Sequence, residues 1–205
     1  MLSTTEWIVL LAGLALVAIA TIALLAARAT RKRHLELKQR FGPEYDRALH
    51  QRGSVSRAER ELVAREKRVS KQRLRPLREA ERVQFLADWR DTQARFVDDP
   101  AGAVQAADEL IKAVMLARGY GVERFDQRVA DLSVDHAAVV QHYRAAHELA
   151  QANREGRANT EELRQAVVHY RALFADLLER PELEGTLDLD AAARVTRDTG
   201  AHSRA

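Results

Sequence analysis

An uninterrupted apolar segment near the start of the chain dominates its pattern of hydrophobic and polar positions. From Trp7 to Ala27, 21 consecutive residues carry no charge. A helix rises about 1.5 Å per residue, so a helix of this length extends roughly 31 Å, which matches the hydrocarbon core of a bilayer. The pattern predicts a transmembrane helix over residues 7–27, preceded by a short tail over residues 1–6.

Charged residues dominate the next segment, residues 28–76, and predict a basic juxtamembrane helix and stalk. Gly42 and Pro43 indicate the first helix break, because proline lacks an amide donor and restricts the residue before it. Ser56 and Glu59 have the spacing of a capping box, which predicts the start of a further charged helix.

Apolar residues are sparse in this stalk, and three of them, Val55, Leu62 and Val69, recur at an interval of seven. A solvated stalk helix explains such a sparse pattern. The alternative is one column of a coiled-coil seam, through which two copies of the chain would form a homodimer.

From residue 77 onward, apolar residues recur at intervals of three and four, the pattern of amphipathic helices. Each such helix must bury one face, so we expect a small antiparallel helical bundle over residues 77–180. Residues 181–205 have the composition of a mostly disordered tail. The expected elements are a helix over about residues 78–97, a helix capped by Asp99 that begins at Pro100 and ends at Gly119, a short helix over about residues 122–132, a helix capped by Ser133 or Asp135, and a helix opened by a capping box at Asn159 and Glu162.

Composition agrees with an all-α fold. Hydrophobic residues make up 46% of the chain and aromatic residues 5%, and there are four prolines. We therefore expect a single N-terminal transmembrane helix, a charged helical stalk and a bundle with a mainly aliphatic core. The sequence has no cysteine, which excludes disulfides and thiolate metal sites.

The formal charge of +3 conceals an uneven distribution. Residues 28–80 contain 17 Lys/Arg and 7 Asp/Glu, a net charge of +10, whereas residues 81–205 contain 16 and 22, a net charge of −6. A nucleic-acid-binding protein usually carries its basic residues on the folded domain. Because they follow the apolar segment here, we expect the membrane as the partner and no nucleic acid.

Side chains at both ends of the apolar segment suit a membrane boundary. Trp7 has the amphipathic ring typical of one interface, and Arg28, Arg31, Lys32 and Arg33 would lie among the lipid headgroups of the other. No Lys or Arg precedes the segment, so the positive-inside rule predicts a single-pass protein of the cell membrane with its C-terminal domain in the cytoplasm.

A cleaved signal peptide is the competing interpretation, and it would make the protein secreted. Signal peptides have a basic start, an apolar stretch of about 7–15 residues and a small-residue cleavage site. This chain has an acidic start, a longer apolar stretch, and an Ala-x-Ala site with Arg28 at its centre. These differences favour an uncleaved anchor.

Four histidines of the bundle segment, His136, His142, His147 and His169, raise the question of a metal site. His142 and His147 are five residues apart and therefore point to different faces of a helix. His147 also lacks the second histidine of a zinc-protease motif, because position 151 is glutamine. We therefore expect no metal and no cofactor.

Ser133, Asp135 and His136 are the residue types of a hydrolytic triad, but such near neighbours are more typical of a helix cap. We expect no catalytic residue and no enzymatic activity. The alternative is an enzyme that uses the region around His136 and His147.

Four local strings occur together between Leu37 and Leu178: Arg40 to Arg47 (RFGPEYDR), Arg95 to Pro100 (RFVDDP), Asp131 to His136 (DLSVDH) and His169 to Phe174 (HYRALF). As a set they resemble an uncharacterised family of short bacterial proteins with an N-terminal membrane segment, named as hypothetical, membrane or secreted proteins. The resemblance implies a membrane segment and no particular activity.

These features together predict a membrane-tethered cytoplasmic helical module for interaction or scaffolding. It would bind the membrane through its anchor and a protein partner through its helical bundle. The alternative is a secreted or extracytoplasmic helical protein.

Overall fold

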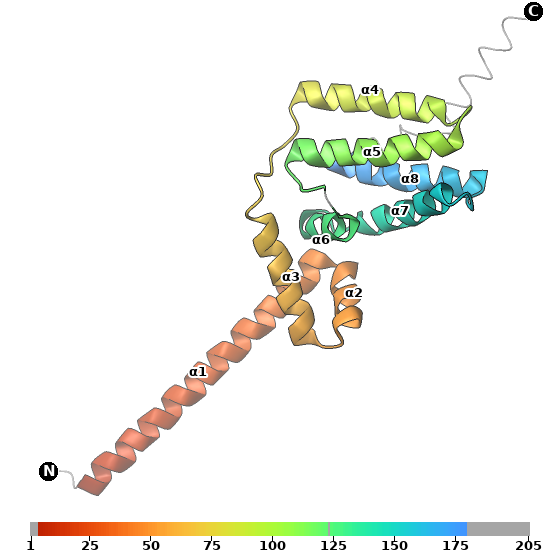
Figure 1. Cartoon of the computed structure of the whole chain (residues 1–205). Helices are drawn as coiled ribbons and strands as arrows, with labels where there is room; N and C mark the ends of the chain where they lie inside the picture. Colours follow the sequence, from red (N-terminus) through yellow and green to blue (C-terminus); the bar gives the residue numbers. More distant parts are fainter. Residues whose placement is uncertain (1–3, 123, 180–205) are drawn as a thin grey trace, which may run out of the picture. The chain divides into compact units, whose positions relative to one another are not determined.

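Eight α-helices and no strands make up the described residues of the computed structural model, which are 4–122 and 124–179 (Figure 1). The prediction of an all-α protein is confirmed. The tail expected over residues 181–205 lies outside the described residues. The helices are α1 (Thr4–Phe41), α2 (Pro43–Arg52), α3 (Val55–Val69), α4 (Glu79–Arg95), α5 (Pro100–Arg118), α6 (Phe125–Asp135), α7 (Val140–Arg154) and α8 (Thr160–Leu177).

The chain divides into two compact units, and the boundary falls inside α3, between Leu62 and Val63. The first, which we call unit 1, contains α1, α2 and the first half of α3. The second, unit 2, contains the rest of α3 and the helices α4 to α8.

In unit 1, α1 is a single helix of 38 residues that runs from the apolar segment through the basic residues. It ends at Phe41, and Gly42 follows with φ +48°, a conformation that glycine adopts at little cost. Pro43 begins α2. Proline has no amide hydrogen, and this costs little here because the first amides of a helix have no intrahelical acceptor. The predicted break at Gly42 and Pro43 is confirmed.

Unit 1 also buries more apolar surface than a solvated stalk would. A few apolar residues at suitable positions are enough to bury one face of each short helix. The prediction of a solvated stalk is therefore wrong for this unit. Its buried apolar residues, all less than 4% exposed, are Leu37, Phe41, Tyr45, Ala48, Ala58 and Leu62.

The column of apolar residues spaced by seven on α3 is not a surface seam. Leu62 and Val69 are 0% and 5% exposed, whereas Val55 is 44% exposed. A coiled-coil partner would need all three side chains at the surface. Two of them belong instead to the core of the chain's own fold.

Ser56 and Glu59 do not form the predicted capping box. α3 begins at Val55, and the Glu59 carboxylate accepts a hydrogen bond from Tyr45 of α2 and lies against His34 of α1. The prediction is wrong because side chains from two other helices compete for the same carboxylate.

In unit 2, α4 to α8 pack around one hydrophobic core (Figure 1). α4 neighbours α5, α7 neighbours α8, and α5 also packs against α7 and α8. Trp89 of α4 stacks on Phe174 of α8, with ring centroids 4.7 Å apart. The prediction of a mainly aliphatic core is confirmed, although aromatic side chains are among its bulkiest members. The bulkiest fully buried side chains of this unit include Trp89, Tyr143, Tyr170, Phe174, Ile111 and Met115.

Several predicted helix ends in unit 2 are confirmed. The Asp99 side chain accepts a hydrogen bond of 2.8 Å from the amide of Gly102, and Pro100 begins α5. Gly119 ends that helix in the left-handed conformation, with φ +94°. Asn159 forms the expected capping box at the start of α8.

The start of α7 differs from the prediction. Ser133 and Asp135 belong to the last turn of α6, and α7 begins only at Val140, without a side-chain cap from Val139. The Ser133 hydroxyl donates to the carbonyl of Ala130 in its own helix at 2.7 Å. That local bond removes the hydroxyl from any capping role.

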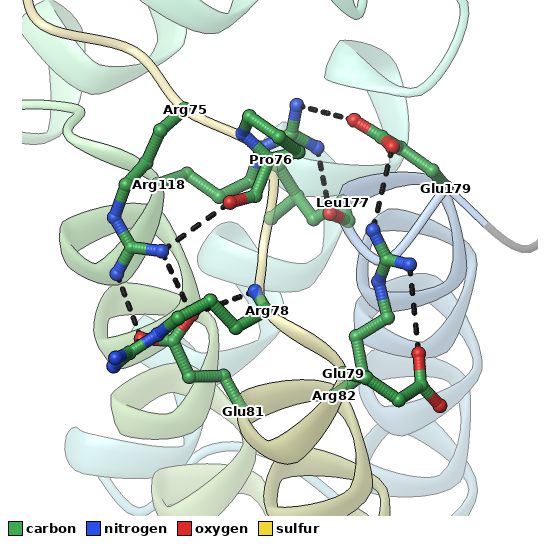
Figure 2. A network of polar contacts seen from close by, with 9 residues as sticks. All are labelled: Arg75, Pro76, Arg78, Glu79, Glu81, Arg82, Arg118, Leu177 and Glu179. Atoms are coloured by element: carbon green, nitrogen blue, oxygen red, sulfur yellow. Dashed lines mark hydrogen bonds and ion pairs between the residues drawn. The ribbon is translucent and has the colours of Figure 1, made fainter.

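The extended segment before α4 is held by a network of polar contacts, shown in Figure 2. Arg75 places both terminal nitrogens on the Glu81 carboxylate, at 2.8 and 2.7 Å, and the amide of Arg78 donates to the same group. Hydrogen bonds from these two arginines hold the pKa of Glu81 well below its usual range. The Arg75 amide also bonds to the Arg118 carbonyl at 3.0 Å, which ties this segment to the end of α5.

Arg118 joins the ends of α5 and α8 in the same network (Figure 2). Its guanidinium donates to the carbonyl of Leu177 at 2.7 Å and to the carboxylate of Glu179 at 2.8 Å. Arg82 of α4 lies 3.7 Å from the same carboxylate. Glu179 therefore connects three helix ends at one side of the bundle.

Candidate functional site

The four cations predicted at the membrane boundary lie on the surface of α1. Arg28, Arg31, Lys32 and Arg33 are all exposed. Successive helical residues are turned by about 100°, so these side chains spread around the helix rather than forming one stripe. Lys32 lies 3.7 Å from Glu36 on the following turn. The arrangement forms a basic ring around α1, by which we mean these four residues.

On the N-terminal side of the basic ring, α1 exposes apolar side chains on every face. Among residues 14, 16–25 and 27, whose side chains the structure describes, their positions along the helix cover the full turn, and no stripe is buried against the rest of the chain. The exposed residues, each 53–68% exposed, are Leu14, Leu16, Val17, Ile19, Ile22, Leu24 and Leu25.

The predicted transmembrane segment is only partly covered by the described side chains. Those of residues 7–13, 15 and 26 lie outside the described set, and Trp7, the predicted outer boundary residue, is among them. Among the residues that the structure does describe, no helix combines the length and the apolar character needed to cross a membrane.

Just beyond the basic ring, a cluster of three polar side chains connects the helices of unit 1. Glu59 Oε1 accepts a hydrogen bond from the Tyr45 hydroxyl at 3.1 Å and lies 2.7 Å from His34 Nδ1. The Tyr45 hydroxyl is 3.0 Å from the same nitrogen. Burial first, and then the hydrogen bond to Glu59, raise the pKa of Tyr45 to about 12, so its hydroxyl remains a donor.

An open groove of about 450 Å³ lies beside this cluster. Its large apolar walls are unusually accessible, since Leu35 is 58% and Val55 44% exposed. No local pattern predicts the groove, because residues about twenty positions apart must pack side by side to form it. The lining residues are Thr30, Arg31, His34 and Leu35 of α1, and Val55 and Glu59 of α3.

The histidines of unit 2 do not form one site. His142 of α7 and His169 of α8 face each other, with their Nδ1 atoms 2.9 Å apart. Two neutral rings can share one proton at this distance, whereas two protonated rings would repel each other. Burial, and then the neighbouring His142, lower the pKa of His169. The sequence prediction considered spacing within one helix and missed this pair between two helices.

His147 lies elsewhere, stacked on Phe125 with ring centroids 3.6 Å apart. Burial lowers its pKa, which favours the neutral ring. Over residues 4–122 and 124–179, no group of three or more His, Cys, Asp or Glu side chains could hold a metal ion.

Ser133, Asp135 and His136 are not arranged as a hydrolytic triad. The His136 imidazole pairs through Nδ1 with the carboxylate of Asp176 on α8. The Ser133 hydroxyl is fully buried and contacts Arg65 at 3.3 Å. Its hydroxyl hydrogen is donated to the carbonyl of Ala130, whereas a catalytic serine donates it to a base. His136 and His147 have different partners, Asp176 for the first and the Phe125 ring for the second.

A buried polar network inside the bundle was not anticipated from the sequence. Asp108 of α5 accepts a hydrogen bond of 2.8 Å from the Tyr170 hydroxyl and lies 2.8 Å from Lys112. Arg128 donates to the Tyr143 hydroxyl at 2.8 Å. The sequence signal that could have indicated this network is Asp108, a charged residue among the apolar positions of α5. Because these groups have partners, the network is a structural feature of the core.

Comparison of the chain with protein families, with curated proteins and with solved structures finds no match. The resemblance to short bacterial proteins with an N-terminal membrane segment therefore stays a prediction. The candidate site rests on the chain's own geometry: the exposed apolar part of α1, the basic ring and the adjacent groove.

Proposed function

We propose that this protein is a membrane-tethered helical module that presents its bundle in the cytoplasm for interaction or scaffolding. The observation that carries the proposal is the exposure of apolar side chains on every face of α1 between Leu14 and Leu25. A helix that is apolar all round is stable when an apolar medium surrounds it. The acyl region of a bilayer is such a medium.

The basic ring supports the same proposal. It follows the apolar segment within a few residues on the same continuous helix, where anionic headgroups would lie. Each Lys or Arg near such a surface contributes about 1 kcal/mol before screening by salt. Basic residues on this flank favour a cytoplasmic location for the helices that follow.

The charge of the bundle segment supports a role in recruiting a partner. Residues 81–205 carry a net charge of −6, so an anionic membrane surface repels them while the basic ring binds it. An acidic bundle held at a membrane is suited to a basic partner protein, because opposite charges accelerate association. The separation of Ser133, His136 and His147 into different environments is consistent with a role in binding rather than in catalysis.

Extraction of membranes from expressing cells tests the tether. The wild-type chain should remain in the membrane pellet after an alkaline carbonate wash. A double variant, Val17→Arg with Ile19→Arg, should be lost to the supernatant, because each arginine at the centre of a spanning helix costs about 3 kcal/mol.

A control that adds the same two arginines outside the segment, Gln39→Arg with Gln51→Arg, should stay in the pellet. Both glutamines are exposed, so the control changes the same charge without disturbing packing. Extraction of the wild-type chain, or equal behaviour of both double variants, would contradict the tether.

A further inference from the structure

Helix α3 carries two cations on the face that points away from its buried residues. Arg60 and Lys67 are exposed and lie two turns apart, with the exposed Ala64 between them. These three residues, which we call the cationic face, lie on the side of the helix opposite the fully buried Leu62. In the part of the chain that the structure describes, neither cation has a hydrogen-bond or ion-pair partner.

Helix α4 and the turn after it present an acidic face of the same length. Asp91 and Asp98 are exposed and lie seven residues apart, with the exposed Ala94 between them. Asp98 follows the helix end at Arg95, and its amide donates to the Arg95 carbonyl at 3.2 Å, so the chain is still turning there. Over residues 4–122 and 124–179, neither carboxylate has a partner. The exposed Arg90 is turned about 100° from Asp91 and lies at the edge of this acidic face.

We propose that the cationic face of one copy of the chain binds the acidic face of a second copy, with the two helices antiparallel. A contact between two helices is smaller than the about 1,200 Å² buried in the least extensive stable interfaces. This inference rests on the proposed function, because confinement to one membrane raises the local concentration of the copies and compensates for a small contact.

The spacing of the two faces favours the antiparallel arrangement. The residues of the cationic face follow one another at intervals of four and three, and those of the acidic face at intervals of three and four. Antiparallel alignment therefore pairs Lys67 with Asp91 and Arg60 with Asp98, and the central alanines meet. Two alanines allow close approach of the helices. A parallel alignment would match the charges but displace the alanines by one residue.

The charge distribution favours a second copy as the partner. Residues 28–80, which include the cationic face, carry a net charge of +10, and residues 81–205, which include the acidic face, carry −6. A nucleic acid would attract the first segment and repel the second, whereas a second copy uses both. Since the two faces are different surfaces, each copy can bind one neighbour through each face, and the contacts can continue from copy to copy.

Disulfide cross-linking in isolated membranes tests the contact, because the sequence has no cysteine of its own. Two full chains with different tags are expressed together, one with Ala64→Cys and the other with Ala94→Cys, and the membranes are treated with copper phenanthroline. The pair should form a mixed disulfide-linked dimer, and each variant expressed alone should stay monomeric. Both alanines are exposed, so neither change should affect folding.

Ala80→Cys is the matched control for Ala94→Cys. Ala80 is exposed on the same helix, 14 residues earlier and therefore about 21 Å away along the axis. Combined with Ala64→Cys, it should give little mixed dimer. Equal yields from the two combinations would overturn the contact in favour of random collision in the membrane.

Charge reversal tests the predicted ion pairs. Lys67→Glu in the Ala64→Cys chain should lower the dimer yield about fivefold, because it places a carboxylate opposite Asp91. Asp91→Lys in the Ala94→Cys chain should restore the yield. A yield that Lys67→Glu leaves unchanged, or that the second reversal does not restore, would overturn the pairing.

Absence of the mixed dimer would also overturn the self-association. An alkaline carbonate wash of the same membranes separates this failure from failure of the tether. A chain that stays in the pellet without cross-linking contradicts the contact alone, whereas a chain that leaves the pellet contradicts the proposed function itself.

Discussion

Asp131 accepts a hydrogen bond of 2.8 Å from Arg68, a residue 63 positions earlier in the chain. The same carboxylate, only 2% exposed, also accepts from Gln72 and Gln127, each at 2.7 Å. Three donors compensate the desolvation of the buried charge. Within unit 2, this carboxylate joins the end of α3 to α6.

Replacing Asp131 with alanine should therefore lower the free energy of unfolding by about 2 kcal/mol, because its donors lose their charged acceptor. Arg68 is 40% exposed and can be solvated after the change, which keeps the loss below that of a fully buried pair. Urea unfolding in detergent, followed by circular dichroism, measures the effect.

Asp91→Ala is the control for that experiment, because the Asp91 side chain is exposed on α4. It removes the same side chain from the surface and should change the free energy of unfolding by less than about 0.5 kcal/mol. Equal effects of the two changes would show that the hydrogen bonds of Asp131 do not stabilise unit 2.

Gly119→Ala should lower the free energy of unfolding of unit 2 by about 2 kcal/mol. The residue has φ +94°, and an added Cβ would lie 2.4 Å from the Arg73 carbonyl oxygen. Either the end of α5 or the segment before α4 must move. Thermal unfolding by circular dichroism measures the loss.

Gly121→Ala provides the matched comparison for this glycine. A Cβ at Gly121 would meet nothing within 4 Å, and its φ is not in the left-handed region. Its melting temperature should stay near that of the wild type. A Gly119→Ala protein as stable as Gly121→Ala would contradict the described geometry.

Acid should destabilise unit 2 below about pH 6.5, the ordinary pKa of histidine. Burial lowers the pKa values of His147 and His169 in the folded chain, so the unfolded chain binds protons first as the pH falls. Stability therefore rises with pH in this range and is lost as the pH falls through about 6.5. Urea midpoints between pH 7.5 and 5.5 measure the slope.

The variant His147→Gln with His169→Gln should reduce this slope, since it removes both groups. His50→Gln should leave it unchanged, because His50 is exposed on α2. A slope that is the same in all three proteins would show that these two partly buried histidines do not control the acid response.

Helix ends that depend on nearby residues could be predicted from the sequence. Asp99 and Gly102 are three residues apart, as are Asn159 and Glu162, so each bond is a property of a single turn. The break at Gly42 and Pro43 is equally local.

Interactions between distant residues could not be predicted in this way. Glu59 was expected to cap its own helix, but Tyr45 and His34 use its carboxylate. The pairing of His142 with His169 likewise depends on how α7 and α8 pack. A sequence pattern shows which faces need covering and does not specify the register between two helices.

In the candidate site, too, the part formed by neighbouring residues could be predicted from the sequence and the part formed by distant residues could not. The cations of the basic ring were identifiable because charge next to an apolar segment is a local pattern. The groove was not, because Leu35 of α1 and Val55 of α3 must pack side by side to form it.

Cysteine labelling tests the central claim, a membrane tether with a cytoplasmic bundle, most directly. The sequence has no cysteine, so Glu148→Cys introduces a single thiol. Glu148 lies on α7, and its side chain is exposed. In intact bacterial cells expressing the full chain, a membrane-impermeant maleimide should not label this thiol, and permeabilisation should make it react fully. Labelling in intact cells, or recovery of the labelled chain from the medium, would contradict the account.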